Sequence, residues 1–273
     1  MKETREVDYG GGRIGGGAAL VFIAGPCVIE SLEHTLAMAH RLREIAEAEG
    51  APLIFKASYD KANRSSPDWY RGPGLAAGLE VLARVKAETG LPILTDVHRF
   101  EEIGPAAAIA DIVLVPAFLC RQTDFVVVVA RAGRAVNIKK GQFLAPWDME
   151  NVVAKARGAG NERLILTERG ASFGYNNLVA DMRSLVILRR LGYPVVFDAT
   201  HSVQLPGGLG KASGGQREFV LPLARAAAAV GIDGLFTEVH DCPDCALCDG
   251  PNAITPETFR ELIRVTRRIA AIE

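Results

Sequence analysis

Residues 53–66 read Leu-Ile-Phe-Lys-Ala-Ser-Tyr-Asp-Lys-Ala-Asn-Arg-Ser-Ser. The apolar start of this stretch is typical of a buried strand. The cations and small polar side chains that follow are hydrogen-bond donors of the kind that bind phosphate or carboxylate oxygens. The stretch therefore predicts a strand that ends in an anion site, and a solvated basic loop is the alternative.

An apolar run that ends in polar, charged or glycine residues and leads into a helical segment occurs eight times along the chain. Strands that alternate with helices predict an α/β protein with a parallel sheet, and eight such units in about 250 residues fit a closed (β/α)8 TIM barrel. An open doubly wound sheet is the alternative. The predicted strands are residues 20–25, 53–58, 92–96, 112–117, 135–139, 164–169, 194–198 and 234–238.

The segment 1–19 carries two glycine triplets ahead of the first predicted strand. A dinucleotide-binding loop must follow a strand, so this segment predicts an N-terminal hairpin or arm instead. Residues 20–273 are then expected to form a single barrel domain. Ser31 and Thr255 are expected to cap helices, and Pro146 suits the first turn of another helix.

The chain has 273 residues, of which 49% are hydrophobic, and a formal net charge of -1. This charge favours neither nucleic-acid binding nor attraction to an anionic membrane. No apolar run reaches about 18 residues, and the start of the chain lacks the apolar core of a signal peptide, so a cytoplasmic protein is predicted. The cysteines are odd in number, which predicts reduced thiols and no disulfide framework.

Cations gather at the predicted carboxyl ends of the strands, where a barrel of this kind has its active site. Because side chains alternate along a strand, Lys139 shares a face with Asn137, and the same parity makes Lys56 and Arg169 inward candidates. Several inward cations repel one another unless an anion binds, which favours a substrate with phosphate and carboxylate groups. The alternative is a set of ion pairs with the carboxylates Asp96, Asp198 and Glu238.

Candidate metal ligands also fall at strand ends. Cys27, His201 and Glu238 lie at or just past the first, seventh and eighth predicted strands, which are neighbours in a closed barrel, and Asp249 lies in the loop that follows. A thiolate, an imidazole and carboxylates suit zinc, iron or manganese. Taken one at a time, these residues can also be explained as a packed thiol, a hydrogen-bonded histidine and an ion-pair partner.

Cys242, Cys245 and Cys248 are spaced like ligands of a zinc or iron–sulfur centre. No matching fourth ligand lies nearby in the sequence, so reduced loop cysteines are predicted in place of a separate cluster. Cys120 is expected to be structural.

Several of these stretches resemble 3-deoxy-D-manno-octulosonate 8-phosphate synthases, and the resemblance runs from residue 22 almost to the carboxyl end. It implies a (β/α)8 enzyme that condenses phosphoenolpyruvate with D-arabinose 5-phosphate and water. The products would be the eight-carbon sugar acid phosphate and inorganic phosphate, in lipopolysaccharide synthesis. The matching stretches are 23–27, 30–31, 55–66, 116–124, 137–147, 167–170, 173–178 and 198–208.

The resemblance assigns roles to individual residues. Phosphoenolpyruvate would be held by Lys56, Lys61, Lys139 and Arg169, and the pentose phosphate by Asn63, Arg64 and Ser65. The metal of the metal-dependent class would be one zinc, iron, manganese or cobalt ion per subunit, bound by Cys27, His201, Glu238 and Asp249. The predicted catalytic residues are Lys56, Lys61, Asp96, Lys139, Arg169 and His201. The predicted substrate-binding residues are Ser58, Asn63, Arg64, Ser65, Phe118, Arg121 and Gln204.

The resemblance also implies a homo-oligomer, predicted to be a tetramer, in which Phe118 and Arg121 reach the mouth of a neighbouring subunit. The closest competing family is 3-deoxy-D-arabino-heptulosonate 7-phosphate synthase, which uses erythrose 4-phosphate. Its basic motif typically reads Lys-Pro-Arg-Thr-Ser, whereas residues 61–65 here read Lys-Ala-Asn-Arg-Ser, which favours the octulosonate enzyme. Members of the metal-independent class have Asn where this chain has Cys27. An alternative of another class is a non-catalytic barrel that binds sugar phosphates.

Overall fold

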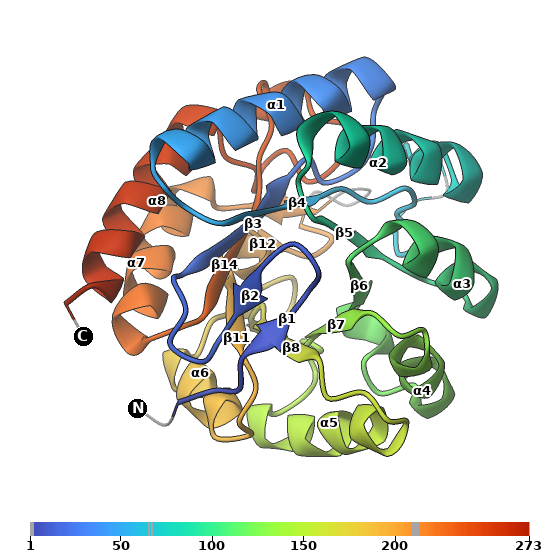
Figure 1. Cartoon of the computed structure of the whole chain (residues 1–273). Helices are drawn as coiled ribbons and strands as arrows, with labels where there is room; N and C mark the ends of the chain where they lie inside the picture. Colours follow the sequence, from blue (N-terminus) through green and yellow to red (C-terminus); the bar gives the residue numbers. More distant parts are fainter. Residues whose placement is uncertain (1–2, 65, 67, 209–212, 273) are drawn as a thin grey trace.

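The computed structural model describes residues 3–64, 66, 68–208 and 213–272. Its centre is a closed barrel of parallel strands in the order β11-β14-β3-β4-β5-β6-β7-β8, wrapped by helices (Figure 1). The predicted TIM barrel is therefore confirmed, and the open doubly wound sheet is excluded. The barrel strands are β3 (Val21–Gly25), β4 (Leu53–Lys56), β5 (Ile93–Asp96), β6 (Ile112–Val115), β7 (Ala135–Lys139), β8 (Leu164–Glu168), β11 (Val195–Asp198) and β14 (Gly234–Glu238).

The outer helices begin largely where the sequence predicts. Ser31 caps α1, because its side chain accepts a hydrogen bond from the His34 amide at 3.1 Å, and Thr255 caps α8 in the same way. Pro146 instead opens a short 3-10 turn, η2 (Pro146–Asp148), which leads into α5. No described helix is both long and apolar enough to cross a lipid bilayer. The helices are α1 (Leu32–Ala48), α2 (Leu75–Thr89), α3 (Phe100–Ile109), α4 (Thr123–Arg131), α5 (Met149–Gly158), α6 (Met182–Arg189), α7 (Val220–Val230) and α8 (Pro256–Ala270).

Side chains alternate in direction along each strand and so form two apolar layers, one inside the barrel and one between the strands and the outer helices. Ile54 and Ala135 belong to the cluster inside the barrel, whereas their neighbours Phe55 and Val136 pack in the larger cluster between strands and helices. Because side chains on one strand face alternate with period two, the same parity carries Lys139 to the inside at the carboxyl end of β7. The predicted inward direction of this lysine agrees with the packing.

An antiparallel hairpin of β1 (Val7–Asp8) and β2 (Arg13–Ile14) lies across one end of the barrel, in front of the strands in Figure 1. Its side chains Val7, Tyr9 and Ile14 are buried in the same cluster as the interior strand residues. The Thr4 hydroxyl donates to Asp233 at 3.0 Å, just ahead of β14, which ties this segment to the barrel. The segment predicted as a hairpin or arm is a hairpin that fills this end.

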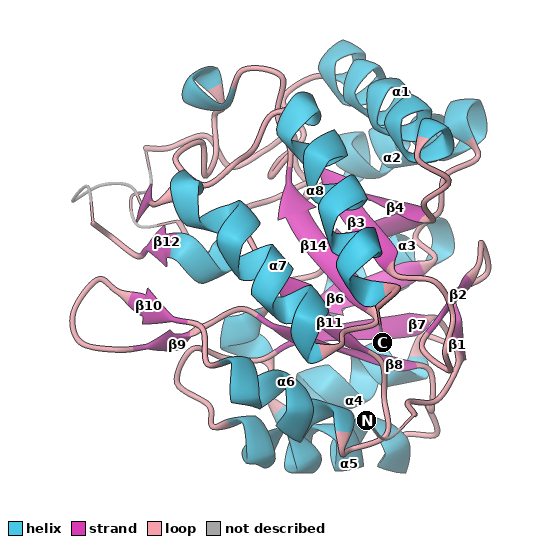
Figure 2. Cartoon of the chain, turned by 90° about the vertical axis from the view of Figure 1, so that its left-hand side faces the viewer, coloured by secondary structure: helices cyan, strands magenta, loops and turns pink. Residues whose placement is uncertain are grey.

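The short strand pairs around the loops lie at the opposite end of the barrel from the hairpin (Figure 2). They are β9 (Ala171–Ser172) with β10 (Leu178–Val179), and β12 (Gln204–Leu205) with β13 (Gly214–Gly215). These pairs follow the carboxyl ends of β8 and β11. The fold thus closes one end with apolar side chains and leaves the loop-bearing end for ligands.

Replacing Ile14 with alanine should lower the free energy of unfolding by about 2–5 kcal/mol, because it removes a fully buried side chain from the hairpin. Urea unfolding followed by circular dichroism measures the change. The matched control is Ile272→Ala, at a residue that is 83% exposed, which should change the value by less than about 0.5 kcal/mol. Equal effects of the two substitutions would show that the hairpin does not pack into the barrel in solution.

The prediction that all the cysteines are reduced is wrong for two of them. Cys242 and Cys245 form a disulfide around η5 (Pro243–Cys245), a one-turn helix that brings their Cα atoms to 5.3 Å. This separation lies within the range that a disulfide spans, which the spacing of two intervening residues makes possible locally. Among the described residues, the free cysteines are Cys27, Cys120 and Cys248, and all are buried.

Candidate active site

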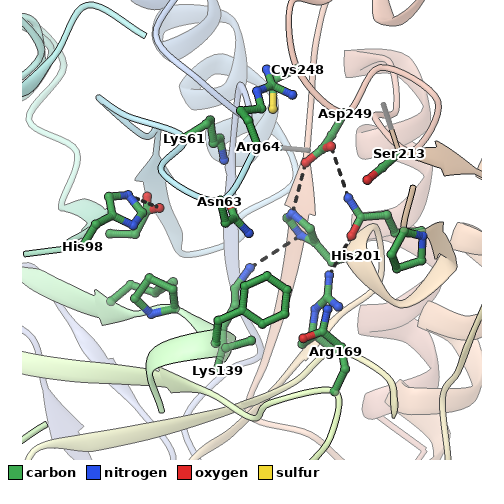
Figure 3. A pocket seen from close by; sticks show the side chains of 18 of the residues that line it. Lys61, Asn63, Arg64, His98, Lys139, Arg169, His201, Ser213, Cys248 and Asp249 are labelled. Atoms are coloured by element: carbon green, nitrogen blue, oxygen red, sulfur yellow. Dashed lines mark hydrogen bonds and ion pairs between the residues drawn. The ribbon is translucent and has the colours of Figure 1, made fainter. Parts of the chain in front are cut away.

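A cavity of about 180 Å³ opens between the carboxyl ends of the barrel strands, and Figure 3 shows its side chains. Residues that are far apart in the sequence meet here because every barrel strand ends at the same rim. Two predicted metal ligands, Cys27 and Glu238, are buried next to the lining residues Asp249 and Lys56. The predicted site residues that line the cavity are Lys56, Lys61, Asn63, Arg64, Asp96, Phe118, Lys139, Arg169, His201, Gln204 and Asp249.

Two of the inward lysines pair with buried carboxylates. Lys56 Nζ lies 3.2 Å from Glu238 Oε1, and Lys139 Nζ lies 2.6 Å from Asp198 Oδ2. The ion pairs considered as an alternative at these lysines are therefore present. Burial lowers the pKa of Lys139, and the attraction of Asp198 does not fully offset it. A buried ammonium with a lowered pKa gives up its proton more readily than an exposed lysine.

Two other cations keep donors free. Arg169 Nη2 donates to Gln204 Oε1 at 3.0 Å, but its Nη1 is buried and has no hydrogen-bond partner among the described residues. Lys61 lines the cavity and forms no ion pair within the described part of the chain. Burying a donor without a partner costs free energy, so these groups are placed to bind an anion that enters the cavity.

Asp96 at the end of β5 sits within a polar network. Its carboxylate accepts from Ser58 Oγ at 2.5 Å and lies 3.2 Å from His98 Nε2. Burial raises the pKa of Asp96, but Lys56, His98 and Lys61 outweigh burial and hold it well below its ordinary value. Ser58 is fully buried and does not line the cavity, so it contacts Asp96 and not the open space. His98 lines the cavity, although the sequence reasoning gave it no role.

The basic loop after β4 bends over the cavity. Asn63 lines the cavity, and Arg64 donates to the carbonyl oxygens of Tyr70 and Leu247 at 2.8–3.0 Å, which joins this loop to the loop after β14. Ser65, predicted to bind the pentose phosphate, lies outside the described residues.

The predicted subunit-contact residues differ in position. Phe118, in η1 (Ala117–Leu119), lines the cavity and is 51% exposed. Arg121 is exposed and does not line the cavity of its own chain, and its carbonyl oxygen accepts from Lys155 at 2.9 Å.

The predicted metal ligands converge at the floor of the cavity, where Figure 3 shows His201 and Asp249 facing each other. His201 Nε2 lies 3.6 Å from Glu238 Oε1 and 3.6 Å from Asp249 Oδ2. Cys27 Sγ lies 3.2 Å from Asp249 Oδ2. The four side chains come from the ends of β3, β11 and β14 and from the loop after β14, as the order of the strands requires.

This arrangement fits a divalent cation. The buried Glu238 Oε2 has no hydrogen-bond partner among the described residues, so the carboxylate has an oxygen to spare. Asp198 lies 2.8 Å from His201 Nδ1, and a carboxylate in that place holds the proton on Nδ1 and leaves Nε2 free to coordinate. Burial raises the pKa of the Cys27 thiol, and the neighbouring acidic groups raise it further. A coordinated metal ion would remove that thiol proton.

Cys248 is a residue that the sequence reasoning placed only in a loop. Its Sγ lies 2.9 Å from Cys27 Sγ, and both thiols are buried beside Asp249. The signal was its position directly before Asp249, since a side chain next to a ligand in a tight loop stays close to the same centre. Asp249 has a φ of 47°, which shows how sharply the backbone turns here.

Comparison with known proteins assigns the chain to a family. The profile of the DAHP synthetase I family matches residues 3–271. A protein named 2-dehydro-3-deoxyphosphooctonate aldolase from Trichlorobacter lovleyi is 60% identical over 270 residues, which are 99% of this chain and 98% of that protein. Proteins of the same name from Geotalea uraniireducens and Geobacter metallireducens are 61% and 62% identical over 269 residues, which are 98% of this chain and 99% of each relative.

These relatives bear the name of the octulosonate enzyme, although the family takes its name from the competing heptulosonate enzyme. The chain therefore belongs to the DAHP synthetase I family, and within it to the group of 2-dehydro-3-deoxyphosphooctonate aldolases, also called 3-deoxy-8-phosphooctulonate synthases, that its sequence resembles.

Proposed function

We propose that the chain is the enzyme that condenses phosphoenolpyruvate with D-arabinose 5-phosphate and water to give 3-deoxy-D-manno-octulosonate 8-phosphate and inorganic phosphate. The observation that carries this proposal is one cavity that holds cations with free donors beside a cluster of metal-binding side chains. The names of the relatives agree with it. A barrel that only binds sugar phosphates would need the cations but would have no need of the metal-binding side chains as well.

The cations would act on the charges of phosphoenolpyruvate. Arg169 and Lys61 would bind its phosphate and carboxylate oxygens through their free donors. The methylene carbon of phosphoenolpyruvate then attacks the aldehyde carbon of the pentose, and the cations stabilise the negative charge nearby. Lys139, with its lowered pKa, would give a proton to the oxygen of that aldehyde as the new carbon–carbon bond forms.

Water completes the reaction at the carbon that carried the phosphate group. The added hydroxyl replaces the phosphate, which leaves as inorganic phosphate. Asp96 would accept hydrogen bonds from the sugar hydroxyls or from this water, because its lowered pKa keeps it ionised. Asp198 would keep His201 in the orientation described above.

One divalent ion per subunit would be bound by Cys27, His201, Glu238 and Asp249. When bound, it would polarise the aldehyde or acidify the attacking water, which in favourable sites brings the pKa of water from about 15.7 to roughly 7. The donor set suits zinc, iron, manganese or cobalt better than magnesium, since magnesium prefers oxygen ligands. The placement of a thiol among the donors is what supports the metal-dependent class.

The choice of sugar tests the proposal. Release of inorganic phosphate should be fast with arabinose 5-phosphate and at least about 100-fold slower, per kcat/KM, with erythrose 4-phosphate, because the amide of Asn63 can both donate to and accept from the extra hydroxyl groups. Asn63→Pro should reduce this preference by about tenfold or more. The control is Asn151→Ala, on α5, which is exposed and does not line the cavity. A preference for erythrose 4-phosphate in the unchanged enzyme would refute the assignment, and binding without phosphate release would favour the non-catalytic barrel.

The subunit arrangement is a separate part of the proposal. We expect a homotetramer in which Phe118 and Arg121 complete the cavity of a neighbouring subunit, and a cytoplasmic location. The exposure of both residues beside the cavity rim supports the first expectation. Light scattering at assay concentration tests it, and a fully active monomer would contradict it.

A further inference from the structure

A second cluster of metal-binding side chains lies outside the cavity, where the chain enters α1 and leaves β14. A nitrogen of His34, a nitrogen of His240 and a carboxylate oxygen of Glu30 all lie within 4.8 Å of one another. The predicted ligands Cys27 and Asp249, together with Cys248, meet the same condition at the floor of the cavity. None of the cluster residues lines that cavity.

The two histidines approach the same carboxylate in different ways. His34 Nε2 hydrogen-bonds Asp241 Oδ1 at 3.0 Å. His240 Nδ1 lies 3.1 Å from that oxygen and accepts a hydrogen bond from the Cys242 amide at 3.0 Å. The other nitrogen of each ring, His34 Nδ1 and His240 Nε2, is buried and has no hydrogen-bond partner among the described residues. In His34 a carboxylate holds one ring nitrogen and leaves the second free, which is the usual setting of a histidine that ligates a metal.

Glu30 supplies the third donor. Its Oε1 lies 3.3 Å from His240 Nε2 without forming a hydrogen bond, and it accepts from the Leu247 amide at 2.8 Å. The histidine rings lie with their centroids 4.6 Å apart, so the two imidazoles reach the same small region. A structural network of hydrogen bonds would have no reason to leave a buried nitrogen of each ring unpaired.

We propose that Glu30, His34 and His240 bind a second divalent ion, of the zinc class, with Asp241 as the carboxylate that orients His34. Two imidazoles and one carboxylate leave a fourth position for water and are the donors that zinc accepts in three-ligand sites. Magnesium and calcium prefer oxygen donors, so they fit this set poorly. The ion would tie the start of α1 to the loop between Asp241 and Asp249.

Zinc binding to the full-length protein tests the proposal. After removal of all metal, equilibrium dialysis against zinc without a reducing agent should load the unchanged protein with two ions per chain. His34→Ala should bind one, His201→Ala should bind one, and the double variant should bind none. Asp241→Asn should weaken the second site about 10- to 100-fold, the usual effect of losing an orienting partner. The control is His40→Ala, on the same helix and 39% exposed at its side chain, which should still bind two ions.

A second set of variants tests whether the second zinc ion is bound by the thiols of Cys242 and Cys245 and not by the histidines. Cys242→Ser combined with Cys245→Ser should leave zinc at two ions per chain if the histidines hold the second one. Loss of the second ion in that variant, together with its retention in His34→Ala, would overturn the proposal. Binding of a single ion by the unchanged protein would overturn it as well if His34→Ala kept that ion and His201→Ala lost it. The His201→Ala count reports the cavity site separately, so failure of one site does not hide the other.

Discussion

His201→Ala is expected to bind no metal in the cavity and to lose kcat by a factor of about 1,000 or more. The imidazole stands between Glu238 and Asp249, with its Nε2 3.6 Å from an oxygen of each. A metal ion contributes several kcal/mol to stabilising the charge that develops in a transition state, and each 1.36 kcal/mol changes the rate about tenfold. Metal analysis and steady-state phosphate release measure the two losses together.

The control for this substitution is His40→Ala, because His40 lies on the outer face of α1 and pairs only weakly with Glu88 at 3.7 Å. It should keep its metal and its kcat. Circular dichroism shows whether each variant is folded. Full activity of a folded His201→Ala enzyme whose cavity holds no metal would contradict the metal-dependent mechanism and would leave Cys27 and Asp249 as packing residues.

Arg169→Ala is expected to lower kcat/KM for phosphoenolpyruvate by at least about 100-fold, with most of the change in KM for that substrate. The guanidinium has a buried donor without a partner among the described residues, so the anion is expected to bind there. Losing one side of a buried charge pair costs about 2–5 kcal/mol. Arg169→Lys should recover only part of the loss, since an ammonium lacks the planar fork that binds two oxygens at once.

Arg183→Ala is the matched control, because that side chain is 86% exposed and its one partner within the described part of the chain is Asp181, at the start of α6. Its kinetic constants should not change. The measurement is initial velocity against phosphoenolpyruvate at saturating pentose phosphate, and then the reverse. If Arg169→Ala raised KM for the pentose phosphate alone, the proposed division of the cavity between the two substrates would be wrong.

The barrel could be predicted from the sequence because its signal is repeated and local. Each buried strand contains a short apolar stretch, and polar residues at or after its end mark the rim, so eight weak signals support one another. The inward direction of Lys139 followed from the parity of a single strand. The meeting of Cys27, His201 and Glu238 followed in turn, because a closed barrel makes the first and last strands neighbours.

The features of the site that could not be predicted from the sequence depend on the conformations of loops. Cys242 and Cys245 were expected to be reduced because the total number of cysteines is odd. That total does not show whether two nearby cysteines bond to each other. Cys248 was left without a role because its approach to Cys27, 221 residues earlier in the chain, depends on the path of the loop after β14. Whether Arg169 has a donor without a partner likewise depends on contacts between residues far apart in the chain. The spacing of residue types along the sequence does not show such contacts.

The hairpin at the closed end has a consequence for the order in which the fold forms. It precedes all eight barrel strands in the chain, yet Thr4 bonds to Asp233, a residue 229 positions later. Until that region has been made, Val7, Tyr9 and Ile14 have no interior to enter, and they remain available for wrong contacts. Contacts between such distant residues slow folding, because a long loop must close before they form. We therefore expect the last strand and the first hairpin to dock together as a late step, so that a nascent chain halted before β14 stays sensitive to proteases at its amino-terminal end.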